Sequence, residues 1–150
     1  MKYFTISELT RSDTASIKKI DNTPNKEITE HLIELVEKLL DPLRSAWAEY
    51  CDVNRLGNPA ISVNSGYRCN ELNKAVGGSL TSAHLTGYAA DIIPSNGQMK
   101  EFQVWITEAI EEFDFDQLIY ERPRNGIASW IHLGLKNKDG MQRRQKFTII

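Results

Sequence analysis

The sequence predicts an α+β domain, with a small antiparallel sheet and helices packed on one side of it. Two stretches place apolar residues at helical spacing, and five short runs are rich in β-branched and aromatic residues. A loop typical of hairpins separates two of these runs, which favours antiparallel pairing. The 150 residues suffice for one hydrophobic core and contain no repeat or linker, so we expect one domain over residues 1–150.

Capping signals place the first helices. Thr5 and Glu8 have the spacing of a capping box and predict a short helix near the N-terminus. Thr23 and Pro24 predict the N-cap and first position of a longer helix, whose apolar side chains recur over residues 28–47. The apolar stripe predicts a surface that faces the core.

Pro42 should kink or restart this helix, because proline lacks the backbone N–H that a helix needs. A second amphipathic helix is expected over residues 98–112. The segment 122–126, which contains Pro and Gly, predicts a hairpin loop. The predicted strands are residues 60–64, 88–93, 115–120, 129–135 and 146–150.

Charge and composition exclude several classes of protein. The net charge of −2 argues against a nucleic-acid partner, and the basic run 136–146 is interrupted by Asp139 and Gly140, so we interpret it as a solvated face. No apolar run approaches the ~20 residues of a membrane span, and the N-terminus lacks the features of a secretory signal. We therefore expect a monomer that is cytoplasmic as made. Cys51 and Cys69 are expected to be reduced thiols, since two cysteines do not form a disulfide framework.

The histidines are the most informative residues for function. His31 lies within the first long helix without a partner at ligand spacing, and it is expected on the surface. His84 precedes Asp91 by seven positions, and Asp91 and His132 both lie in apolar strands, where a polar group is costly unless it is paired or bound to metal. Two histidines and a carboxylate are a common ligand set of catalytic zinc. The alternative is a core histidine at His132 and a turn cap at Asp91.

Several motifs, in a fixed order along the chain, support the metal interpretation. They are Ser7–Ser12, Ser65–Arg68, Val76–Ser79, Ser82, His84, Gly87, Ala89, Asp91, Phe115–Glu121, Trp130 and His132. Together they resemble the zinc D-Ala-D-Ala carboxypeptidases, with the VanX-type dipeptidases and the L-alanyl-D-glutamate endopeptidases of phage endolysins. The likeness is strongest to small phage and prophage members, extends from Phe4 to about Gln145, and implies a fold like that of the hedgehog amino-terminal domain.

The resemblance implies that His84, Asp91 and His132 bind one zinc ion. It also implies that Arg68 grips a carboxylate of a peptidoglycan peptide, for which its planar fork of donors is suited. The alternative for Arg68 is a surface salt bridge. Ser82 is a candidate for binding substrate or for orienting the site. Gly66 and Gly87 are expected at tight backbone positions beside the site.

The general base is where this sequence departs from the family pattern. Many relatives carry an acid three residues before the last histidine ligand, and Ser129 occupies that position here. Glu121 is the replacement we favour, because it ends the strand that should pair with the strand of His132. The hedgehog domain likewise has a glutamate after a similar apolar strand. The alternative is an ion pair of Glu121 with Arg122 or Arg124 in the loop.

Three functions remain open from the sequence. The first is a zinc peptidase of carboxypeptidase, dipeptidase or endopeptidase type, which would act on the cell wall after release or from within a virion. The second is a zinc-bearing binding module without turnover, which the serine at position 129 keeps open. The third is an unmetallated phage structural or assembly domain. Cys69, next to Arg68, is expected to be a buried thiol and no metal ligand.

Overall fold

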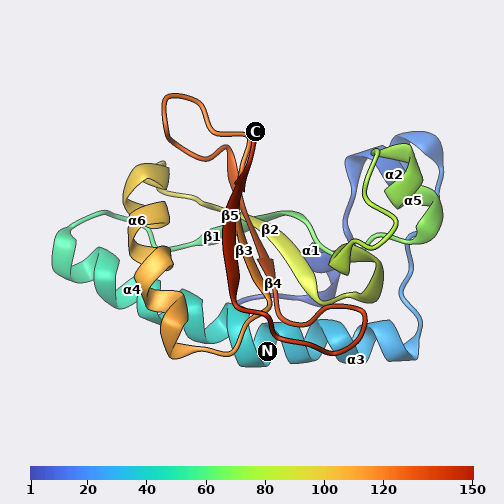
Figure 1. Cartoon of the computed structure of the whole chain (residues 1–150), viewed down its shortest axis with the longest axis horizontal. Helices are drawn as coiled ribbons and strands as arrows, with labels where there is room; N and C mark the ends of the chain where they lie inside the picture. Colours follow the sequence, from blue (N-terminus) through green and yellow to red (C-terminus); the bar gives the residue numbers. More distant parts are fainter.

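The computed structural model describes all 150 residues and confirms the α+β class (Figure 1). One five-stranded sheet has the strand order β1-β2-β4-β3-β5. In chain order the elements are α1 Ile6–Thr10, α2 Asp13–Lys18, α3 Lys26–Leu35, the π-helix η1 Val36–Leu40, α4 Asp41–Asn54, β1 Ile61–Ser65, α5 Asn70–Ala75, the 3-10 turn η2 Ala83–Thr86, β2 Ala89–Pro94, α6 Met99–Ala109, the 3-10 turn η3 Ile110–Glu112, β3 Gln117–Glu121, β4 Trp130–Gly134 and β5 Gln145–Ile149.

The sheet is mixed and not wholly antiparallel. Strands β1, β2, β4 and β3 pair antiparallel in that order, and the loop that joins β3 to β4 is the expected hairpin. Strand β5 instead runs parallel to β3. Strand β4 already has β2 on one side and β3 on the other. The chain that leaves β4 therefore adds β5 at the free edge of β3, and β5 runs in the same direction as β3.

The first long helix begins later than the sequence predicts. Asn25, and neither Thr23 nor Pro24, caps α3, since its side-chain oxygen accepts a hydrogen bond from the Ile28 N–H at 2.8 Å. The expected capping box at Thr5 and Glu8 is present at the start of α1. A side-chain carbonyl of asparagine satisfies a free helix N–H as well as a threonine hydroxyl does, which explains the shift of two residues.

Pro42 is accommodated without a break in the helical rod. A π-helical turn, η1, connects α3 to α4, and Pro42 is the second residue of α4, so the irregular turn lies directly before the proline. The rod runs beneath the sheet in Figure 1, with α6 beside it. Helix α6 and η3 together cover the range predicted for the second amphipathic helix.

The sheet has two different faces because side chains alternate along each strand. Ile131 and Leu133 of β4 belong to the hydrophobic core, which they share with Leu118 of β3 and with side chains of the helical rod and α6. His132 lies between Ile131 and Leu133 and therefore points to the opposite face. That face carries the candidate site, with η2 and α5 beside it (Figure 1).

The remaining expectations concern the surface and the thiols. Residues 138–145 are exposed, as expected of a solvated basic run. Cys51 is buried, and the Cys69 sulfur accepts a hydrogen bond from the Leu72 N–H at the start of α5, so both cysteines are free thiols with structural contacts. None of the helices combines the length and the apolar character that crossing a bilayer requires.

Candidate metal centre and its cleft

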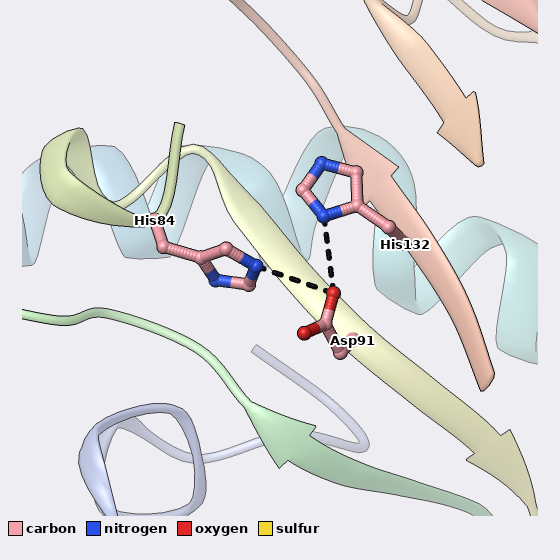
Figure 2. A group of neighbouring side chains, drawn as sticks. All are labelled: His84, Asp91 and His132. Atoms are coloured by element: carbon pink, nitrogen blue, oxygen red, sulfur yellow. Dashed lines mark hydrogen bonds and ion pairs between the residues drawn. The ribbon is translucent and has the colours of Figure 1, made fainter. Parts of the chain in front are cut away.

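The structure brings His84, Asp91 and His132 together at the centre of the sheet. Asp91 of β2 lies opposite His132 of β4 in the strand register, while His84 comes from η2. Oδ1 of Asp91 lies 3.2 Å from Nε2 of His84 and 3.0 Å from Nδ1 of His132 (Figure 2). The three donor atoms lie within 4.8 Å of one another, so this cluster can hold a metal ion.

The hydrogen bonding of His84 favours a cation in the cluster. Its Nδ1 lies 2.6 Å from the carbonyl oxygen of Gly66, which can only accept, so Nδ1 carries the proton. In neutral His84, Nε2 then presents a lone pair to the carboxylate oxygen of Asp91. Two lone pairs facing each other at this distance repel unless a proton or a metal ion lies between them. The tautomer is thus the one that a metal ligand needs.

The electrostatics of the cluster agree with this state. Burial lowers the pKa of His84 more than Asp91 raises it, so the imidazole stays neutral. Burial by itself raises the pKa of Asp91, but positive charge on His84 and hydrogen bonds from His132 and His84 would lower that pKa well below its usual range, so the carboxylate is stable when the cluster carries a positive charge. Metal ligands must be deprotonated, and two neutral imidazoles with one carboxylate are the donor set of many catalytic zinc sites.

Close backbone packing positions His84. A Cβ atom at Gly66 would lie 2.2 Å from the carbonyl oxygen of Leu9, so only glycine lets the chain after β1 approach α1. Gly87 ends η2 with a φ of +81°, a conformation that favours glycine. Ser82 caps η2, because its hydroxyl accepts the N–H of His84 at 3.2 Å. The expected tight positions at Gly66 and Gly87 are therefore both found.

A cleft of about 470 Å³ surrounds the cluster and contains Arg68. Arg68 is half-buried and forms no salt bridge, which excludes the simplest alternative for it. Its Nη2 donates to the Ser82 hydroxyl at 3.4 Å, whereas its buried Nε–H has no acceptor. The terminal N–H groups that do not bond to Ser82 have no acceptor in the protein either, so they can receive one from a molecule bound in the cleft.

Glu121 lies in the same cleft as the metal cluster. It ends β3 opposite Trp130 of β4, two positions along the strand from Ile119, which pairs with His132. Burial, followed by the Asp91 carboxylate, raises the pKa of Glu121, although His132, Arg122 and Arg68 oppose the shift. A raised carboxyl pKa brings the group closer to the range in which it can accept and release a proton near neutrality.

The alternative for Glu121 finds no support, since Glu121 forms no salt bridge with Arg122 or Arg124. The Arg122 side chain lies instead over the ring of Trp130. Ser129 donates its hydroxyl proton to the carbonyl oxygen of Arg122 at 2.6 Å and thereby closes the hairpin. The Ser129 hydroxyl is therefore bonded within the loop, and Ser129 is not among the residues that line the cleft.

Two supporting residues escaped the sequence analysis. His31 is no free surface residue, since its Nδ1 lies 2.6 Å from the carbonyl oxygen of Thr86 and its ring stacks on Tyr88. Asn22 donates to the Tyr67 carbonyl and accepts the N–H of Cys69, so it clamps the segment that carries Arg68. Neither contact has a sequence signal, because each joins segments more than 40 residues apart.

Two histidines and a carboxylate in a cleft form a candidate metal site, with the donor set that many zinc hydrolases use. The sequence matches the Peptidase M15 family over residues 2–134, and the chain belongs to this family. The protein is thus a metallopeptidase, as the motifs predict. A comparison with curated proteins finds no match.

Proposed function

We propose that this protein is a zinc peptidase that hydrolyses peptide bonds in the stem peptides of peptidoglycan. One observation carries the proposal. The Nε2 lone pair of His84 faces the Asp91 carboxylate, an arrangement that favours a bound cation, inside a cleft that also contains Arg68 and Glu121. His84, Asp91 and His132 would hold one zinc ion per chain. Zinc in such a site would lower the pKa of a coordinated water to about 7 and would polarise a carbonyl.

The residues of the chain have separate tasks in this scheme. Glu121 takes the proton of the attacking water and passes it to the leaving amine, which is the usual role of a positioned carboxylate of raised pKa. Arg68 binds a carboxylate of the peptide and so fixes the scissile bond in the cleft. Ser82 supports Arg68 through its hydroxyl and holds the turn of His84.

The substrate class rests on the resemblance described above and on Arg68. A guanidinium in the cleft favours peptides with a free carboxylate near the bond that is cut, as in D-Ala-D-Ala and L-alanyl-D-glutamate sequences. We propose that the protein, of phage or prophage type, acts on the wall after release from the cytoplasm or from within a virion. A monomer suffices for this activity, since every residue of the scheme comes from one chain.

A zinc-bearing binding module is the second candidate, because Ser129 replaces the acid that many relatives carry. Digestion of purified peptidoglycan, followed by mass analysis of the fragments, separates the two. Released peptides with a single type of new end would establish the peptidase and identify the bond. Binding to the wall with zinc present and without any released fragment would establish the module.

A further inference from the structure

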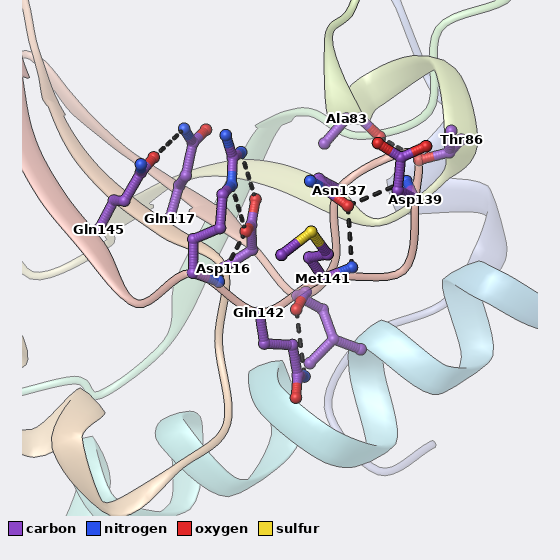
Figure 3. Close-up of polar contacts among 11 residues, drawn as sticks. Ala83, Thr86, Asp116, Gln117, Asn137, Asp139, Met141, Gln142 and Gln145 are labelled. Atoms are coloured by element: carbon purple, nitrogen blue, oxygen red, sulfur yellow. Dashed lines mark hydrogen bonds and ion pairs between the residues drawn. The ribbon is translucent and has the colours of Figure 1, made fainter.

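An ion pair between a buried acid and an exposed arginine also lines this cleft, apart from His84, Asp91 and His132. Asp116 is 1% exposed and lies just before β3, and its carboxylate accepts Nε and Nη2 of Arg143, both at 2.8 Å (Figure 3). The backbone N–H of Arg143 donates to the same carboxylate at 3.0 Å. Asp116 therefore fixes the Arg143 side chain and at the same time ties the loop after β4 to β3.

This arrangement leaves one edge of the Arg143 guanidinium free. Asp116 engages the side-on edge, formed by Nε and Nη2, and the other N–H groups have no acceptor in the protein. The Arg143 side chain is 36% exposed and lines the cleft. A guanidinium held rigidly from behind loses little entropy when its end-on edge binds a carboxylate.

A pair of side-chain amides lies next to this guanidinium. Nε2 of Gln117 donates to Oε1 of Gln145 at 2.9 Å (Figure 3). A hydrogen bond between two such amides leaves one carbonyl oxygen and one NH₂ group free, whichever way each amide is oriented. The pair therefore offers one acceptor and one donor, which suits the peptide group beside a bound carboxylate.

Gly134 lies between the metal-ligand residue His132 and Gln117. A Cβ atom at Gly134 would lie 3.7 Å from Nε2 of His132 and 3.9 Å from Cβ of Gln117, so the missing side chain leaves the space between them open. Arg68 follows β1 and Arg143 precedes β5, the two outer strands of the sheet. Asp91 and His132 lie on β2 and β4 between them.

We propose that Arg143 and the Gln117–Gln145 amide pair form a second carboxylate subsite. A substrate whose first carboxylate binds Arg68 would extend past the metal site and place its second carboxylate at Arg143. The inference rests on the proposed function and deepens it, because it restricts the substrate to peptides with carboxylates on both sides of the scissile bond. Ile119 pairs with His132 on one side and with Phe147 on the other, and both apolar side chains line the cleft. They would contact an aliphatic side chain of that peptide.

Calorimetric binding to the zinc-loaded protein tests the subsite, with Glu121→Gln as the parent protein, in place of wild type, in every comparison so that the probe is not cleaved. The probe is a synthetic stem pentapeptide ending in D-Ala-D-Ala, with its D-Glu carboxylate and its C-terminal carboxylate free, beside two versions that each have one of these amidated. Gln117→Glu should weaken binding of the free peptide roughly tenfold, and Gln117→Lys should not, because only the first variant places a negative charge beside Arg143. Arg143→Lys keeps a cation for Asp116 but loses the end-on edge, so it should also weaken binding.

The amidated peptides locate the effect. Gln117→Glu should leave the dissociation constant unchanged only for the peptide that lacks the carboxylate bound at Arg143. Arg68→Ala should leave it unchanged only for the peptide that lacks the carboxylate bound at Arg68. Ser16→Glu, an exposed change of equal charge on α2, should leave all three dissociation constants as in the parent protein. Equal affinities of the parent protein and Gln117→Glu for every peptide, or no binding of the free peptide to the parent protein, would overturn the subsite. If the Gln117→Glu effect is found but wild type never cleaves peptidoglycan, the subsite stands and the proposed peptidase activity fails.

Discussion

Nε2 of His84 and Oδ1 of Asp91 lie 3.2 Å apart, although the bond from His84 Nδ1 to the Gly66 carbonyl leaves both atoms as acceptors. This relationship requires a positive charge between the two side chains. A proton can supply it only against the burial that lowers the pKa of His84. A divalent metal supplies it without that cost.

Protein purified without added metal should contain about one equivalent of zinc, and His84→Ala or His132→Ala should lose most of it. Because a ligand that binds only the folded state stabilises it, a chelator should lower the Tm by about 5–10 °C. Metal analysis and thermal unfolding check this prediction. Full zinc content in both variants would show that the ligands are other residues.

Glu121→Gln should retain zinc and the Tm of the wild type but lose about 10²–10⁴ in turnover, because an amide cannot accept the proton of the attacking water. Rates on the peptide identified by digestion provide the measurement. Ser129→Ala is the control, and it should have a much smaller effect, since the Ser129 hydroxyl bonds only to the Arg122 carbonyl. An active Glu121→Gln protein would mean that the base lies elsewhere.

Arg68→Ala should keep the fold and the zinc while it lowers kcat/KM on a peptide with a free carboxylate by about 10²-fold, the worth of a charge-assisted pair of hydrogen bonds. Arg68→Lys should restore only part of the rate, because a lysine offers a point charge without a planar fork. Amidation of the carboxylate that Arg68 binds should make wild type and Arg68→Ala equally slow. A loss of the same size on every amidated peptide would argue that Arg68 has a structural role only.

Glu34 should stabilise the protein in a pH-dependent way. Burial by itself raises the pKa of Glu34, but hydrogen bonds from Lys136, Tyr88 and Lys38 lower it to about 2. A carboxyl group whose pKa is lower in the folded than in the unfolded state contributes its full stabilisation at pH values above the unfolded-state pKa. That stabilisation is lost as the pH falls toward the folded-state pKa.

The comparison of wild type with Glu34→Gln tests this point. The variant should be less stable by about 1 kcal/mol at pH 7, and the difference should shrink as the pH falls from about 4.5 to about 2. Denaturant unfolding over this range provides the free energies. Glu30→Gln is the matched control on the same helix, because Glu30 is exposed and forms no salt bridge. A difference that stays constant with pH would contradict the pKa of Glu34.

Gly66→Ala should destabilise the protein by more than about 2 kcal/mol, since the added Cβ would lie 2.2 Å from the Leu9 carbonyl oxygen and must displace backbone. Gly134→Ala is the control, because its Cβ would meet neighbours only at ordinary contact distances and the residue lies in a regular strand. Unfolding free energies of both variants check the prediction. Equal stability of the two would show that α1 and the segment after β1 can separate freely.

Local patterns were sufficient for much of the fold. Apolar spacing predicted the helical rod and α6, and runs of β-branched residues predicted all five strands, because helix and strand periods are properties of neighbouring residues. The start of α3 was misplaced because Thr23, Pro24 and Asn25 all suit a helix start, and only the hydrogen bond of Asn25 to Ile28 decides among them. The parallel partner of β5 depends on which sheet edge is free, which no local pattern contains.

The sequence by itself determined the donor types of the metal cluster, since Asp91 and His132 are polar residues that apolar strands tolerate only with a partner. The tertiary structure decided that His84 reaches them, that Gly66 sets its tautomer, and that Arg68 and Glu121 share their cleft. Asp116 lies near the start of a predicted strand, and no local pattern identifies its partner Arg143, which lies 27 positions away. Residue identity fixes which contacts are chemically possible, whereas distant strand pairing fixes which of them form.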